Sequence, residues 1–195
     1  MLGAMIGDIA GSKYEFNNTF DYDFEMFGEG CDFTDDTICT VAIADAILNG
    51  RSYQESLQDW CRRYPSPKGA YGGRFAQWIR SLDPQPYNSF GNGSAMRVSP
   101  VAWLFDDLSQ VLEEAEKTAL PTHNHPEGIK GAKATSFEDA IRLAISHGDD
   151  SDTIGAIVGS IAEARFGIPQ EMKEKAISYL PDDMKEVLIR IKCCH

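Results

Sequence analysis

The sequence predicts an all-α protein folded as a single domain, on three observations. Apolar residues recur every three or four positions through most of the chain, which is the spacing of one helix face. No segment alternates apolar and polar residues for long enough to form a strand. No repeat, linker or low-complexity stretch interrupts the 195 residues, so we expect residues 1–195 to share one hydrophobic core.

Composition and charge argue against several classes of protein. No apolar run approaches the roughly 20 residues of a membrane span, and no basic region precedes the first apolar residues, so we expect a cytoplasmic protein without a membrane partner. The net charge of -12 repels nucleic acid. The five cysteines lack the paired spacing of zinc ligands and are expected to be free thiols. A monomer is the expected state.

The first helix is expected within residues 1–13, and it carries a stripe of glycines. Gly3, Gly7 and Gly11 are four residues apart, so in a helix they share one face on which another backbone can approach closely. Residues 17–33 lack periodicity and mix aromatic with acidic residues. They are predicted to form a loop that could act as a lid.

The other helices are predicted from their apolar spacing and their end signals. Thr34 is a good N-cap, and Asn49-Gly50 ends the helix that it begins. Residues 87–97, rich in glycine, asparagine and serine, are predicted to form a loop that runs into the apolar stretch 98–105. The predicted helices cover residues 34–48, 53–64, 73–82, 106–120, a segment from Ser136, a segment from Asp152 or Thr153 to Gly167, 170–180 and 182–191.

Two acidic motifs stand at the beginnings of predicted helices. Thr34-Asp35-Asp36-Thr37 and Asp149-Asp150-Ser151-Asp152-Thr153 each combine carboxylates with hydroxyls. Taken singly, either motif could be a helix cap whose acids favour the helix dipole. If the two helix starts face each other, the carboxylates repel and raise one another's pKa unless cations intervene. Ligands made only of oxygen would select Mg²⁺, Mn²⁺ or Ca²⁺, and four carboxylates could bridge a pair of ions.

Two loops are suited to a phosphate. In the segment from Asn88 to Arg97, glycines allow close approach and successive backbone N–H groups could form an anion nest, although a plain turn has the same composition. Thr122-His123-Asn124-His125 supplies imidazoles, which are more often structural than catalytic.

Taken together and in this order, five segments match the signatures of one family. They are Gly7 to Phe16, Phe33 to Thr37, Gly91 to Arg97, Thr122-His123 and Gly148 to Thr153. With them the chain resembles the ADP-ribosylglycohydrolases, from residue 1 to about residue 180. The resemblance implies an orthogonal all-α bundle with two Mg²⁺ or Mn²⁺ ions in a cleft. The implied reaction is hydrolysis of the glycosidic bond between ADP-ribose and an acceptor, either a protein side chain or a small molecule.

The resemblance also implies roles for particular residues. The implied metal ligands are Thr34, Asp35, Asp36, Asp150, Asp152 and Thr153. Glu15 matches a glutamate on a mobile flap, and either Glu15 or Asp35 would take or give the proton in catalysis. The groove for ADP-ribose would be lined by Ser89, Phe90, Gly91, Asn92, Gly93 and His123.

The sequence departs from the family pattern in two places. Asp149 stands where glycine usually precedes the first ligand of the second motif. Residues 133–136 join directly two segments that relatives separate by several helical stretches, so the domain is expected to be shortened near 134–136, unless a mobile stretch is missing there. Two rival functions stay open: a non-catalytic ADP-ribose-binding or structural relative, and another Mg²⁺-dependent phosphohydrolase.

Overall fold

A computed structural model of the chain describes residues 1–87, 89, 91–122, 137–146 and 150–192. These residues form helices and no β-strand, with isolated bridge positions only at Thr34, Lys68 and Ser89, so the prediction of an all-α fold is confirmed. The helices are α1 (Leu2–Gly11), α2 (Asp35–Asn49), α3 (Tyr53–Arg63), α4 (Gly73–Arg80), α5 (Gly93–Met96), α6 (Ser99–Leu104), α7 (Leu108–Ala119), α8 (Phe137–Ser146), α9 (Ser151–Phe166), α10 (Gln170–Tyr179) and α11 (Asp182–Lys192).

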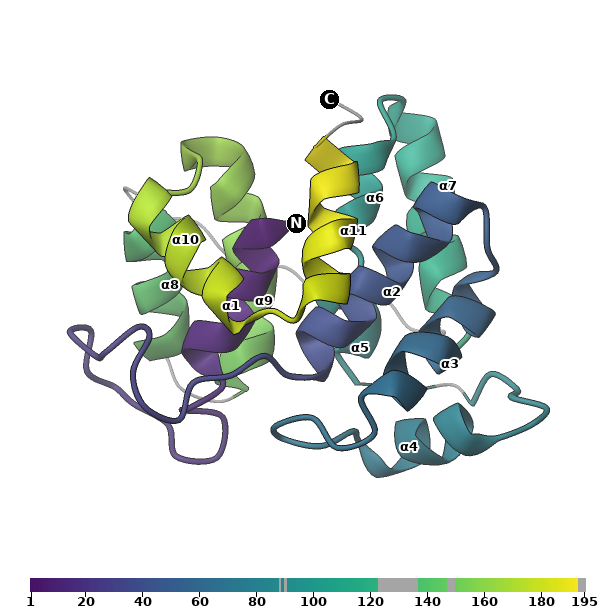
Figure 1. Cartoon of the computed structure of the whole chain (residues 1–195), viewed down its shortest axis with the longest axis horizontal. Coiled ribbons are helices and arrows are strands. Elements are labelled where there is room, and N and C mark those ends of the chain that lie inside the picture. Colours follow the sequence, from purple (N-terminus) through teal and green to yellow (C-terminus); the bar gives the residue numbers. More distant parts are fainter. Residues whose placement is uncertain (88, 90, 123–136, 147–149, 193–195) are drawn as a thin grey trace.

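The helices gather into two groups that meet at α1 and α2. Helices α1, α8, α9 and α10 pack together on one side, while α2 packs on α3, α6 and α11 on the other (Figure 1). Every residue of α1 is buried, so this short helix lies inside the molecule. In the described part of the chain, every helix is too short or too polar to span a membrane.

The glycine stripe of α1 packs directly on the backbone of α9. A Cβ on Gly7 would lie 1.8 Å from the carbonyl oxygen of Gly155, and one on Gly3 would lie 2.2 Å from that of Gly159. At the end of the stripe, a Cβ on Gly11 would lie 2.3 Å from the carbonyl oxygen of Ser151. The predicted packing groove is therefore confirmed, and it brings the end of α1 against the beginning of α9.

Helix α4 ends two residues earlier than the sequence predicts, at Arg80 instead of Leu82. Two side chains of α3 donate hydrogen bonds to carbonyl groups at the end of α4. The Gln58 amide donates to the carbonyl oxygens of Trp78 and Ser81 at 3.1 and 3.0 Å, and Arg62 Nε donates to that of Ile79 at 2.8 Å. Because these long-range partners satisfy the helix end, the chain can turn out of the helix there.

The segment predicted as a loop at residues 87–97 contains a short helix, α5, at Gly93–Met96. Its start packs on α9, and it leads into Arg97, whose side chain is buried. Contacts with distant helices therefore order the end of a stretch whose composition indicates a turn.

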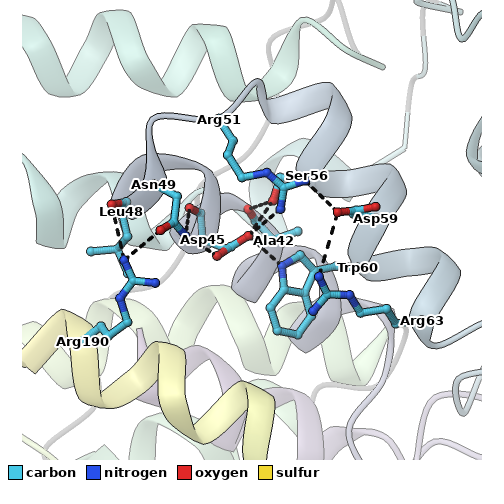
Figure 2. A network of polar contacts seen from close by, with 10 residues as sticks. All are labelled: Ala42, Asp45, Leu48, Asn49, Arg51, Ser56, Asp59, Trp60, Arg63 and Arg190. Atoms are coloured by element: carbon cyan, nitrogen blue, oxygen red, sulfur yellow. Dashed lines mark hydrogen bonds and ion pairs between the residues drawn. The ribbon is translucent and has the colours of Figure 1, made fainter.

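A buried carboxylate, Asp45, fixes the far end of α2 to its neighbours (Figure 2). It accepts hydrogen bonds from Asn49 Nδ2 at 2.6 Å, Arg51 at 3.0 Å and Trp60 Nε1 at 3.1 Å. Arg190 of α11 donates in turn to Asn49 Oδ1 at 3.0 Å. A buried carboxylate needs partners of this kind, and here they hold α2 against α3 and α11 while its other end reaches the candidate site.

We expect Gly7→Ala to destabilise the protein strongly, because the new methyl group meets backbone atoms of α9 that cannot move aside. The loss should be at least about 2 kcal/mol in the free energy of unfolding, toward the upper range for overpacked cores. Denaturant unfolding followed by circular dichroism measures it. Gly73→Ala is the matched control, since its Cβ would meet nothing within 4 Å and should cost nothing. Equal stability of the two variants would contradict the close α1–α9 contact.

Candidate functional site

A cleft of about 360 Å³ lies where the beginnings of α2 and α9 come together. Both predicted acidic motifs line it, joined by a carboxylate from the loop after α1. The acidic wall consists of Glu15, Asp35, Asp36, Asp150 and Asp152, with Thr153 beside them. The Thr153 side chain forms a hydrogen bond with Asp36, and the carboxyl groups of Asp150 and Asp152 form one with each other. Two motifs more than 100 residues apart in sequence therefore meet in one cleft.

Helix α1 holds both motifs in place through its last two turns. Asp8 is fully buried and accepts hydrogen bonds from Thr34 N at 3.0 Å, Thr34 Oγ1 at 2.6 Å and Thr37 N at 3.1 Å. Gly11, on the next turn, lies against Ser151 at the start of α9. Sequence reasoning did not single out Asp8. A lone carboxylate among the apolar residues of a short helix is the signal that could have found it.

Thr34 is completely buried and caps α2. Its hydroxyl oxygen accepts a hydrogen bond from Asp36 N at 3.2 Å, and the same hydroxyl group donates one to Asp8. This arrangement fixes the first turn of α2, from which Asp35 and Asp36 reach the cleft wall.

The clustered carboxyl groups have raised pKa values. Burial is the first cause at each. The negative charge of neighbouring carboxylates adds to it at Asp35, Asp36 and Asp152, whereas hydrogen bonds from Thr34 and Thr37 oppose it at Asp8. The pKa of Asp8 rises to about 6, that of Asp35 to about 7 and that of Asp152 to about 9. Burial and the charges of Asp8, Asp152 and Asp35 also raise the pKa of Asp36 well above its usual range.

Glu15 lies at the rim of this cluster. Its pKa is raised by burial first and then by the charges of Asp150 and Asp8, whereas Lys68 lowers it. Its carboxyl group lies on Gly69, because a Cβ at that glycine would stand 2.5 Å from Glu15 Oε2. The shift in the pKa of Glu15 therefore favours its protonated form, beside the opening of the cleft.

The donor set of the cleft fits a hard divalent cation. Two buried carboxylate oxygens of residues that line the cleft, Asp36 Oδ2 and Glu15 Oε2, have no hydrogen-bond partner. Carboxylate oxygens that repel each other and lack partners are the ligands that Mg²⁺ and Mn²⁺ prefer. Within the described residues, no group of three or more acidic, histidine or cysteine side chains already has the arrangement of a metal site. The oxygens would have to draw together around an ion.

The predicted phosphate loop lines the same cleft and adjoins its acidic wall. Ser89, Gly91, Asn92 and Gly93 line it, and the Asn92 amide donates to Asp150 Oδ2, which links the loop to α9. Ser89 N donates to the carbonyl oxygen of Thr122 at 2.9 Å. Two predicted binding residues, Phe90 and His123, lie outside the described residues, as does Asp149.

A third segment of the wall was missed by sequence reasoning. It consists of Ala70, Gly72, Gly73, Arg74 and Phe75, and Tyr87 adjoins it. Gly69 and Ala70 have φ values of 79° and 65°, and for alanine this left-handed backbone is uncommon and strained. The bridge between Lys68 and Thr34 ties the segment to the start of α2. The sequence signal that could have predicted this segment is the group of glycines in Lys68-Gly69-Ala70-Tyr71-Gly72-Gly73.

The structure is therefore an all-α fold with an acidic cleft that a glycine-rich loop also lines. The chain belongs to the ADP-ribosylglycohydrolase family, whose sequence model matches residues 1–136 and 132–190. The two matched ranges meet near residues 134–136, where a shortened junction is predicted; these residues lie outside the described part of the structure.

Individual relatives support the family at low identity. ADP-ribosylhydrolase ARH3 of Danio rerio is 25% identical over 191 residues, covering 84% of this chain and 52% of that protein. Uncharacterized protein YegU of Escherichia coli is 28% identical over 145 residues, covering 67% of this chain and 42% of that one. The chain spans about half the length of the curated relatives it matches.

The fold is also found in a solved structure. A chain of an ADP-ribosylglycohydrolase-related protein complex superposes with a TM-score of 0.70 at 21% identity. The alignment covers 97% of this chain and 95% of that one, so the likeness extends over nearly the whole fold of both.

The raised pKa values predict how stability depends on pH when divalent ions are absent. Because the folded-state pKa values lie above those of the unfolded chain, the folded cluster binds more protons between about pH 4 and its own pKa values, and stability falls as pH rises through that range. Asp36→Asn removes one charge from the cluster. We expect it to stabilise the metal-free protein by at least about 1.4 kcal/mol more at pH 8 than at pH 5, the equivalent of one pKa unit.

Urea unfolding in EDTA at the two pH values measures this difference. The exposed Asp106→Asn is the control and should change stability equally at both. A pH-independent effect of Asp36→Asn would show that the carboxylates do not interact.

Proposed function

We propose that the protein is a divalent-metal-dependent hydrolase that cleaves the glycosidic bond between ADP-ribose and an acceptor. The observation that carries this proposal is the meeting of Asp35 and Asp36 with Asp150 and Asp152 in one cleft that a glycine-rich loop also lines. The name of the Danio rerio relative, an ADP-ribosylhydrolase, gives the substrate class. The acceptor would be a protein side chain or a small molecule.

The proposed metal ligands come from the two helix beginnings. Asp35 and Asp36 would serve from α2, and Asp150, Asp152 and Thr153 from α9, with Thr34 fixing the start of α2. Asp36 Oδ2 is buried and has no hydrogen-bond partner, so a bound cation would supply the interaction that it lacks. Two Mg²⁺ or Mn²⁺ ions bound here would neutralise the acidic wall, anchor ribose hydroxyls and lower the pKa of a bound water.

The protein's own side chains would carry the proton transfers. Glycosidic cleavage develops positive charge at the anomeric carbon, and carboxylate oxygens of the cleft that the ions leave free would stabilise it. Glu15, whose pKa is raised at the rim, holds the proton that the leaving group needs. Asp35, on the acidic wall of the cleft, would take a proton from the attacking water.

The loop at residues 89–93 would hold the ADP part of the substrate. Ser89 and Asn92 present polar side chains to the cleft, and Gly91 and Gly93 leave their backbones open to a ligand. Among the described residues, a Cβ on Gly91 would meet only the Ser89 side chain, at 3.6 Å, so these residues leave space beside the Gly91 backbone. Phe90 and His123, implied by the family resemblance, would complete this groove.

Asp150→Ala and Asp152→Ala should abolish both metal binding and turnover, because each removes a ligand from the acidic wall. Calorimetric titration with Mn²⁺ measures the first. Chromatographic detection of ADP-ribose measures the second, with ADP-ribosyl-arginine, ADP-ribosyl-serine and O-acetyl-ADP-ribose as substrates. The exposed Asp106→Ala is the control and should behave as wild type.

Each rival function has its own outcome in this experiment. Full turnover in EDTA or in either variant would refute the proposal. Binding of ADP-ribose without any product would favour a non-catalytic relative. Release of phosphate or AMP in place of ADP-ribose would favour a phosphohydrolase.

A further inference from the structure

The cleft carries positive charge as well as negative, in the form of two arginines. Arg74, in the first turn of α4, and Arg97, directly after α5, both line it. Neither pairs with an aspartate or a glutamate within the described residues. In a chain of net charge -12, two arginines without carboxylate partners in one cleft need an explanation.

Arg97 is almost completely buried, with 1% of its surface exposed. Its NH2 group donates to the carbonyl oxygen of Thr118 and to Thr122 Oγ1, both at 2.8 Å, while its Nε is buried without a partner. The groups around its charge include Cys39 and Tyr87, whose pKa values are raised, so neither supplies a negative charge at pH 7. A buried guanidinium without a counter-charge is costly, so the cleft wall is prepared for an anion that the protein does not supply.

Arg74 is exposed, and its guanidinium stands 5.2 Å from the centre of the Tyr87 ring. The Tyr87 hydroxyl forms a hydrogen bond with the Ser89 side chain, and both arginines are close enough to lower the pKa of Tyr87. Arg74 therefore stands beside the phosphate-suited loop. The planar guanidinium fork matches phosphate oxygens, and its stacking on Tyr87 holds it in place without neutralising its charge.

Aromatic packing fixes the beginning of α4. The Phe75 ring stacks on Trp78 with centroids 5.7 Å apart and meets the edge of Tyr71 at the same distance. Phe75, the residue next to Arg74, is therefore held in place, so the Arg74 side chain extends from a rigid part of the cleft wall.

We propose that Arg74 and Arg97 form an anion subsite for the diphosphate of the substrate, with Arg74 in direct contact and Arg97 as a positioning residue beneath the loop. This inference rests on the proposed function for the identity of the diphosphate. The substrate would then lie between unlike walls, its reacting ribose at the carboxylates and its diphosphate at the arginines. The subsite also explains how an acidic protein attracts a ligand of the same sign.

Calorimetric titration of ADP-ribose, ADP and adenosine into wild type and Arg74→Ala, at one fixed Mg²⁺ concentration, tests the direct contact. We expect Arg74→Ala to weaken ADP-ribose and ADP by about 10- to 100-fold, the loss typical of hydrogen bonds to charged groups, and to leave adenosine unchanged. Arg74→Lys should recover part of the affinity. Arg80→Ala, an exposed arginine on the same helix outside the cleft, is the matched control and should have no effect.

The role of Arg97 is tested by Arg97→Lys and Arg97→Gln in the same titrations. The lysine variant keeps the charge and should bind ADP-ribose more tightly than the glutamine variant, while both bind adenosine equally. A merely structural role would weaken adenosine and ADP-ribose by the same factor, and that result would overturn the assignment of Arg97.

Failure of the subsite and failure of the proposed function give different results. Unchanged affinity of Arg74→Ala for ADP-ribose and ADP overturns the subsite, even if the protein hydrolyses ADP-ribose conjugates. Arg74-dependent binding of ADP without hydrolysis of any conjugate leaves the subsite standing and refutes the proposed function. If wild type binds neither nucleotide, both proposals fail.

Discussion

The backbone contact between α1 and α9 is the constraint on which the rest of the structure depends. Because Gly3, Gly7 and Gly11 have no side chains, the two helices touch backbone to backbone, which sets the register of one against the other. That register places the start of α9 beside the last turn of α1, and Asp8 on the preceding turn binds the start of α2. One buried helix thereby aligns both acidic motifs.

The alignment concentrates negative charge that the fold must tolerate. Burying Asp8, Asp35, Asp36 and Asp152 together raises their pKa values, so the charged site opposes folding above neutral pH when no cation is bound. The packing of α1 on α9 and the satisfied Asp45 network offset this repulsion. The cleft contains buried oxygens without hydrogen-bond partners and a strained Ala70, and both lower the stability of the folded protein. Features of this kind are typical of a ligand site.

The sequence predicts well what depends on local pattern. The helix beginning at Thr34, the glycine stripe and the two acidic motifs follow from spacing and capping, and the family resemblance gave the right fold class. What it could not predict depends on contacts between distant residues: the bonds of Asp8 to α2, the early end of α4 under Gln58 and Arg62, and the wall at residues 70–75. These depend on which helices become neighbours, and periodicity does not contain that information.

The central claim is that the carboxylates from α2 and α9 jointly hold divalent cations. Anomalous X-ray diffraction from crystals soaked in Mn²⁺ tests it most directly, because manganese atoms are located without reference to any assumed ligand. We expect anomalous peaks within bonding distance of Asp36 and of Asp152, at the place where the two helix beginnings meet. Peaks confined to other surfaces, with this place empty in the same crystals, would contradict the account.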